Sequence, residues 1–192
     1  DTVGAQATGE RATALGSVSL ASGLRATAVG SRSTAGNESA TALGAFSNAS
    51  GKSSVALGDS AKSSAQSAVA IGAVAVANTS DSIAIGSSAN TSGSTSGGIA
   101  IGYNAKSVGG AIAIGENAYA ESTVVSGEGM ISVAVGMESI AKGEDAAAFG
   151  TRAHAKSDFG TAVGNYANTS ARNATAVGNA ASASGVGSSA FG

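Results

Sequence analysis

One tetrapeptide, X-Ala-apolar-Gly, recurs thirteen times along the 192 residues and restricts the possible folds more than any other feature. Nine of the twelve intervals between its glycines are 14 residues long, and the other three, of 16, 13 and 21 residues, lie in the middle of the chain. A fixed period is the signature of a repeat architecture in which each repeat is one supersecondary unit. We therefore expect one continuous repetitive domain over residues 1–192. The glycines are Gly16, Gly30, Gly44, Gly58, Gly72, Gly86, Gly102, Gly115, Gly136, Gly150, Gly164, Gly178 and Gly192.

The tetrapeptide is typical of the end of a short strand, in which successive side chains point to opposite faces. Its Ala then points to one face, and the two residues that flank Ala point to the other. The residue before Gly is always large and apolar, and the residue before Ala is Val or Ile in the central repeats but mostly Thr toward both ends. A strand that is apolar on both faces is predicted to be buried on both.

A second pattern follows each Gly. The third and fifth residues after it are nearly always Ala, Ser or Thr, such as Ser19 and Ala21, and the residues between them are mixed and often polar. This alternation predicts a second strand with a small inner face and a solvated outer face. Gly closes the first strand at a turn that favours positive φ or a close backbone approach, and a segment rich in Gly, Ser and Asn forms the second turn. Each repeat is therefore predicted to be one coil of a parallel β-solenoid.

The composition determines what can fill such a coil. Ala, Ser and Gly account for 44, 32 and 29 residues, whereas Leu, Ile, Val and Phe together number 33. Small inner side chains let the two sheets approach closely, so the large apolar residues of the first strand must point outward. The net charge of −2 argues against disorder and against nucleic acid as a partner. The absence of Cys excludes a disulfide scaffold and a thiol nucleophile, and the longest apolar stretch is about half of what a membrane-spanning helix needs.

The outward apolar residues predict an interface, because a long exposed apolar patch marks a binding surface. Each fully buried side chain of this size contributes about 1.5 to 3 kcal/mol, so we expect an obligate homo-oligomer with little folded monomer. The predicted interface residues are Leu15, Val29, Leu43, Val55, Leu57, Val69, Ile71, Ile83, Ile85, Ile99, Ile101, Ile112, Ile114, Val133, Val135, Phe149, Val163, Val177 and Phe191.

Three repeats carry a resemblance to a known family: SVALGDS at residues 54–60, SIAIG at 82–86 and SVAVGMES at 132–139. They resemble the Asn-Ser-Val-Ala-Ile-Gly-x-x-Ser repeat of YadA-like head domains, which belong to trimeric autotransporter adhesins of Gram-negative bacteria. The resemblance covers essentially the whole chain. It implies an all-β fold, a left-handed parallel β-roll with coils of about 14 residues, assembled as a homotrimer.

The resemblance also implies a function and a location. It implies a non-enzymatic head on the bacterial cell surface, held at the outer membrane, that attaches to host extracellular matrix or a host cell-surface receptor. On this interpretation residues 1–192 are one head domain, a fragment without the neck, the stalk and the membrane anchor, and the fragment itself does not contact the membrane. The leading Asn of the family repeat occurs only at Asn173, in a repeat with Thr175 in place of Val, so collagen is left open as the receptor.

Outward aromatic and charged residues, and the insertion in the 21-residue interval around residues 122–130, are the candidate ligand surface. Loops and insertions on a rigid scaffold commonly carry recognition, and in repeat proteins they map to one face. The candidate ligand residues are Arg32, Phe46, Lys62, Lys106, Tyr119, Val124, Val125, Glu128, Arg152 and Tyr166.

Other functions have weaker support in the sequence. A trimeric β-solenoid acyltransferase would use a histidine as general base, but those enzymes have hexapeptide repeats, and the single histidine, His154, falls at an outward position of a second strand. Ice binding would need a flat Thr array, and the Thr residues lie on the predicted interface. A passive spacer remains an alternative to the adhesin. No catalytic residue, cofactor or metal site is predicted.

Overall fold

The computed structural model describes residues 4–93, 95–122, 124–125, 128–129 and 131–192, with the backbone alone at 124–125 and 128–129. The chain divides into two compact units, residues 1–91 (unit 1) and 92–192 (unit 2). Strands and turns make up both units, and the described residues include no helix that could cross a membrane. The single domain expected from the sequence stays a prediction.

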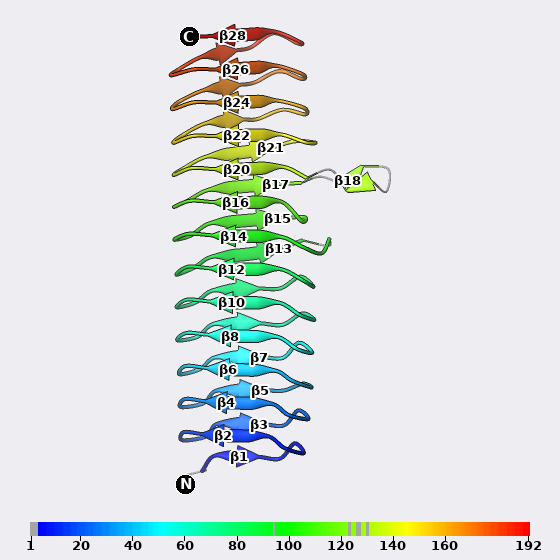
Figure 1. The fold of residues 1–192 in the computed structure, drawn as a ribbon, viewed down its shortest axis with the longest axis vertical. Helices are drawn as coiled ribbons and strands as arrows, with labels where there is room; N and C mark the ends of the chain where they lie inside the picture. The colour runs from blue at the N-terminus through cyan, green and yellow to red at the C-terminus, as the bar shows by residue number, and fades with distance from the viewer. Residues whose placement is uncertain (1–3, 94, 123, 126–127, 130) are drawn as a thin grey trace. The chain divides into compact units, whose positions relative to one another are not determined.

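Unit 1 is a parallel β-solenoid in which every coil gives a first strand to one sheet and a second strand to another (Figure 1). The first strands are β2 (Thr13–Leu15), β4 (Thr27–Val29), β6 (Thr41–Leu43), β8 (Val55–Leu57), β10 (Val69–Ile71) and β12 (Ile83–Ile85). The second strands are β1 (Gln6–Ala7), β3 (Leu20–Ala21), β5 (Thr34–Ala35), β7 (Asn48–Ala49), β9 (Lys62–Ser63), β11 (Val76–Ala77) and β13 (Asn90–Ser92).

Unit 2 repeats this arrangement. Its first strands are β14 (Ile99–Ile101), β16 (Ile112–Ile114), β20 (Val133–Val135), β22 (Ala147–Phe149), β24 (Thr161–Val163), β26 (Thr175–Val177) and β28 (Ser189–Phe191). Its second strands are β15 (Lys106–Val108), β17 (Tyr119–Glu121), β21 (Ile140–Lys142), β23 (His154–Ala155), β25 (Asn168–Thr169) and β27 (Ser182–Ala183).

The 21-residue interval contains an additional element. Strands β18 (Val124–Val125) and β19 (Glu128–Gly129) pair antiparallel, with Val124 opposite Gly129 and Val125 opposite Glu128. Figure 1 shows this hairpin beside the coils of unit 2, between β17 and β20. Beyond it the ladders continue, because Ile112 of β16 pairs with Val133 of β20. The 21-residue interval therefore leaves the register between β16 and β20 intact.

The ladders place equivalent residues of successive coils on one another. Within unit 1, Val69 pairs with Ile83, Ala70 with Ala84 and Ile71 with Ile85, all parallel. The 14-residue period of the sequence is thus the length of one coil. The predicted all-β parallel solenoid is confirmed.

Each interior is filled by small side chains. The central Ala of nearly every first strand is fully buried, as are the inner Ala and Ser of most second strands. Buried Ser hydroxyls satisfy turn carbonyls: Ser19 donates to the Gly16 carbonyl and Ser33 to the Gly30 carbonyl, both at 2.9 Å. The same carbonyls also accept the backbone N–H of that residue, as they do in repeats with Ala at this position, so these bonds satisfy the buried Ser hydroxyls themselves.

The first turn of each coil requires its glycine. Gly58 has φ +136°, and a Cβ there would lie 2.5 Å from the Gly72 carbonyl oxygen of the next coil. Both of the predicted reasons for glycine, positive φ and close approach, therefore apply. Two residues later the chain is left-handed even where the residue disfavours it, as at Phe46 (φ 55°) and Val74 (φ 58°). Closing so narrow a coil overrides the local preference of Val, for which positive φ is an outlier.

Candidate assembly and ligand surfaces

We call the outer side of the first strands, with the interface residues named above, the apolar face. Ala70 is fully buried, and its neighbours Val69 and Ile71 point away from the interior and stack on the equivalent residues of β8 and β12. This stacking covers the flanks of each side chain and leaves its outer end open. Leu57 is consequently 37% exposed, and Phe149 in unit 2 is 42% exposed. The predicted outward orientation is confirmed.

The apolar face carries no charge. None of the first strands in the described parts of either unit contains Asp, Glu, Lys, Arg or His. Charged residues are depleted at the centres of protein interfaces, where large apolar side chains are desolvated together. The apolar face is therefore chemically suited to contact another protein surface, and its role as the interface between copies stays a prediction.

The opposite side of the coils, which we call the second-strand face, is mixed and largely polar. Lys62 is the one charged residue among the second strands described in unit 1, and it is exposed. It stacks between Asn48 of β7 and Val76 of β11. This face needs no second protein surface to cover it, because its polar side chains are accessible to water.

In unit 2 the second-strand face gathers charge around a tyrosine. The ring of Tyr119 has the ammonium of Lys142 at 4.7 Å and that of Lys106 at 5.6 Å from its centroid. Its hydroxyl donates to Glu121 Oε2 at 2.8 Å. Burial, followed by this hydrogen bond, raises the pKa of Tyr119 to about 12, so the ring stays neutral and its hydroxyl stays a donor. Cations held over a tyrosine ring are attracted by its quadrupole.

His154 lies on the same face, between Ile140 of β21 and Asn168 of β25. It is half-buried. Burial, and then the charge of Lys156, lowers the pKa of His154 below its ordinary value. The imidazole is therefore neutral near pH 7. Its outward position agrees with the sequence prediction.

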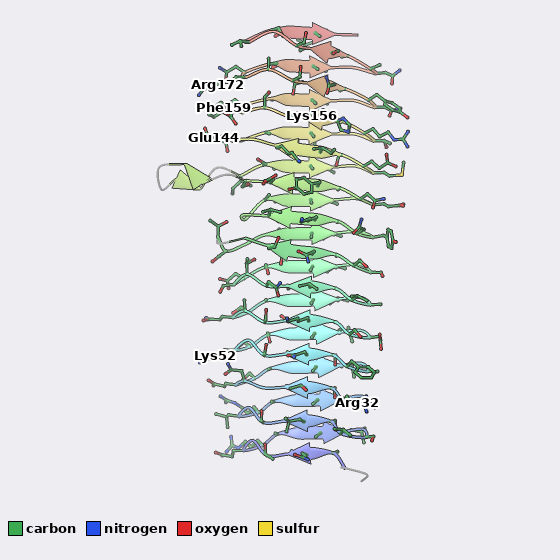
Figure 2. All side chains as sticks on the ribbon, turned by 180° about the vertical axis from the view of Figure 1, so that it is seen from behind. Arg32, Lys52, Glu144, Lys156, Phe159 and Arg172 are labelled. Atoms are coloured by element: carbon green, nitrogen blue, oxygen red, sulfur yellow. The ribbon has the colours of Figure 1, made fainter. Side chains whose placement is uncertain are left out.

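The first-turn edge carries side-chain contacts between residues one repeat apart. The Arg152 guanidinium donates to Glu138 Oε2 at 2.6 Å and also to the Tyr166 hydroxyl. The hydrogen bond from Arg152 lowers the pKa of the Glu138 carboxyl. In unit 1, Arg32, labelled in Figure 2, lies 5.5 Å from the centroid of the Phe46 ring. Such exposed pairs contribute little stability individually, so they mainly order the turn side chains.

The second-turn edge has a similar arrangement. In unit 1, Glu38 bridges two cations, with Arg25 at 2.9 Å and Lys52 at 2.8 Å. Both hydrogen bonds, that of Lys52 first, lower the pKa of Glu38. In unit 2, Arg172 lies 5.3 Å from the centroid of the Phe159 ring, and Figure 2 shows both at one edge of the coils.

The structure brings the predicted ligand residues together in pairs. Arg32 lies over Phe46, Lys106 lies over Tyr119 and Arg152 lies over Tyr166, while Lys62 stands apart. Val124, Val125 and Glu128 are in the hairpin, where their side chains lie outside the described part of the structure. Whether any of these residues contacts a ligand stays a prediction.

Sequence reasoning missed three residues that join these groups. Glu138 lies one repeat before Arg152, so opposite charges at the same repeat position were an available signal. Lys142 and Lys156 occupy the sixth position after their glycines, where the chain leaves the second strand and enters the second turn. Repeat position alone could therefore have placed both on the face of Tyr119 and His154.

The geometry offers surfaces and no enclosed site. No pocket is found, and no group of three His, Cys, Asp or Glu side chains could hold a metal ion, within the residues that the structure describes. The described residues present extended faces and edges that are accessible to another molecule.

Comparisons with known proteins bear on this arrangement. The family model for the YadA head domain repeat (2 copies) matches residues 3–19, 21–47, 49–75, 63–89, 77–105, 141–167 and 170–192, which together exceed half of the chain. A similar solved structure is the collagen-binding domain of the Yersinia adhesin YadA, with 19% identity, a TM-score of 0.37, and coverage of 91% of this chain and 69% of that one. No curated protein sequence matches.

Proposed function

The chain belongs to the family of YadA head domain repeats, and on that premise we propose that it is the head of a bacterial surface adhesin. The head attaches the cell to host extracellular matrix or host cells and is displayed at the outer membrane. The observation that carries this proposal is the division of each coil into an uncharged apolar face and a polar second-strand face. One face suits self-association and the other suits recognition.

The apolar face supports assembly into a homotrimer. Its residues are half-buried to exposed in the single chain, and burying them against other copies is the largest favourable contribution to stability that the sequence offers. The number of copies and the left hand of the coils follow from the family resemblance. In the trimer the interface residues are those predicted from the sequence, and the folded state depends on protein concentration.

The second-strand face and the two turn edges support binding rather than catalysis. They are solvated, they repeat along the coils, and three copies would present each of them three times. Linked copies of a weak contact gain overall affinity through effective concentration without any new contact. The proposed head therefore acts as a rigid multivalent surface.

Two measurements test the proposal. Chemical cross-linking of the purified chain should give a three-chain band, and the cross-linked species should bind immobilised matrix proteins or cultured cells in a solid-phase assay. A verified trimer that binds neither would reduce the protein to a passive spacer. An H154A variant controls for catalysis, since any acyl transfer that disappears on this substitution would favour the enzyme alternative instead.

A further inference from the structure

The second-strand face of unit 2 holds three lysines that pair with no carboxylate among the side chains that the structure describes. They are Lys106, Lys142 and Lys156, and all three are exposed. Three cations at the turn edges differ, because Arg25 and Lys52 are paired with Glu38, and Arg152 with Glu138. Arg32 and Arg172, also at the turn edges, lie over phenylalanine rings.

Lys106 lies on β15, Lys142 lies on β21, and Lys156 directly follows β23. The sheet order β15-β17-β21-β23 brings Lys106, Tyr119, Lys142 and His154 onto successive strands. Three strand spacings correspond to about 14 Å. Figure 2 shows Lys156 over the strands of this unit, apart from Glu144, Phe159 and Arg172 at the edge. The charges thus lie along the direction in which the coils stack.

Glu121 is the one carboxylate in the second strands of this group. It accepts the hydrogen bond of the Tyr119 hydroxyl at 2.8 Å and forms no ion pair with Lys142, its partner in the ladder, among the described contacts. Glu138 is occupied by Arg152. Glu144 and Asp158 lie at the second-turn edge, where the Glu144 backbone N–H donates to Asp158 Oδ1 at 3.0 Å. Counted over the described side chains, the second-strand face between these edges is therefore net positive.

We propose that this face of unit 2, with Lys106, Lys142 and Lys156 as its cationic contacts, binds a linear sulfated polysaccharide. The proposal rests on the proposed adhesive function and names the ligand class of that same head. Sulfate groups repeated along a chain match ammonium groups repeated along a sheet, and a flat face without a pocket suits an extended polymer better than a small molecule. Beside the lysines, Tyr119, Ile140 and His154 follow one another in the ladder, and all three are half-buried.

The same geometry disfavours single-stranded nucleic acid. Sequence-tolerant binding of nucleic acid strands depends on aromatic rings on which bases stack. The Tyr119 ring has ammonium groups at 4.7 and 5.6 Å from its centroid, and these compete for the ring surface that a base would need.

The experiment measures binding of the full chain to immobilised heparin by surface plasmon resonance over a series of NaCl concentrations. The triple variant K106Q/K142Q/K156Q should bind at least about tenfold more weakly near 0.15 M NaCl, since each exposed contact is modest but the assembly repeats it. The slope of log Kd against log salt should fall by about 2, taking for each lost contact the roughly 0.7 that holds for single-stranded nucleic acids. Chemically desulfated heparin should not bind.

Lys62 provides a matched control, because it is an exposed lysine at the same repeat position as Lys106, four residues after its glycine. K62Q should leave the Kd unchanged within twofold, whereas K106Q should weaken binding. Oligomeric state and circular dichroism should be the same for all variants.

The proposal is overturned if the wild-type chain does not bind heparin, if the triple variant binds as tightly as the wild type, or if K62Q weakens binding as much as K106Q. Equal affinity for an oligothymidylate of the same charge would also overturn it and point to nucleic acid. Loss of heparin binding by the triple variant with retained binding to other matrix proteins would leave both proposals standing. A chain that binds matrix but never heparin would refute only this one.

Discussion

The two outer faces of each coil differ sharply although they enclose the same interior. Ile71 and Val76 lie in the same coil, one on the first strand and one on the second, and both flank a fully buried Ala. Ile71 stacks on Leu57 and Ile85, whereas Val76 stacks on Lys62 and Asn90. An apolar residue therefore has different neighbours on the two faces. On the first strand it belongs to a continuous series of apolar residues, and on the second strand it is isolated among polar ones.

This difference shows that the interior does not specify the surface. Ala and Ser fill the coil on both sides, and hydrogen bonds between coils hold both sheets. The narrow interior excludes large side chains, so these point outward. Most of them lie on the first strands, on the face that another copy is proposed to cover. The difference between the two faces therefore resides in their outward positions.

The largest expected effect is on the oligomeric state, and it is seen by introducing one carboxylate on each face in turn. I71E should abolish the oligomer, because each chain would lose an Ile burial worth about 1.5 to 3 kcal/mol and bury an unpaired carboxylate. V76E, beside Lys62, should keep the oligomer with stability within about 0.5 kcal/mol of the wild type. Size-exclusion chromatography with light scattering distinguishes them. An I71E protein with wild-type mass would show that the apolar face is not the interface.

The next effect concerns the turn that separates the faces. A Cβ at Gly58 would meet the Gly72 carbonyl oxygen at 2.5 Å, whereas a Cβ at Gly36 in a second turn would find only the Ser50 Cα, at 4.0 Å. G58A should destabilise the protein by about 3 kcal/mol or more, because the strained φ and the backbone clash add. G36A should be neutral or stabilising by up to about 1 kcal/mol. Urea midpoints at one protein concentration test this, and similar midpoints for the two variants would contradict it.

A smaller gain is expected where the first turn forces a left-handed residue. Val74 has φ 58° and is exposed, and unit 2 uses Asn104 and Asn117 at equivalent turn positions. V74N should stabilise the protein by about 1 kcal/mol, since Asn tolerates this conformation and Val does not. V76N is the control, because that residue is in a strand and gains no such relief. A midpoint for V74N at or below that of the wild type would refute the argument.

The smallest effect is the titration of His154 on the second-strand face. Burial and Lys156 lower its pKa from the ordinary 6.5, so the unfolded chain binds this proton more readily than the native one. The contribution of His154 to stability is therefore complete above pH 6.5 and is lost as the pH falls toward the native pKa. NMR titration of the single histidine should give a pKa below 6.5, and K156Q should raise it. A native pKa of His154 above 6.5 would contradict this prediction, because protonation would then stabilise the folded state.

Particular residues show how far the sequence could predict this arrangement. The repeat period and the alternation around Ala were sufficient to turn Leu57 outward and Ala56 inward, because both follow from strand geometry alone. The left-handed conformation at Phe46 and Val74 could not be predicted, since these residues disfavour it and only closure of the coil imposes it. The cluster at Tyr119 was missed in part, because Lys142 lies after the 21-residue interval and joins it only if the insertion leaves the ladder intact.

The sequence by itself determined the coil: a 14-residue period, two short strands, an interior of Ala and Ser, and a series of large apolar residues that such an interior must exclude. The tertiary structure decided which side chains meet, because stacking places residues one repeat apart within contact distance. It thereby set Arg152 between Glu138 and Tyr166 and placed Lys106 and Lys142 over the Tyr119 ring. Local patterns encode the direction of each side chain, while the register between coils determines its neighbours.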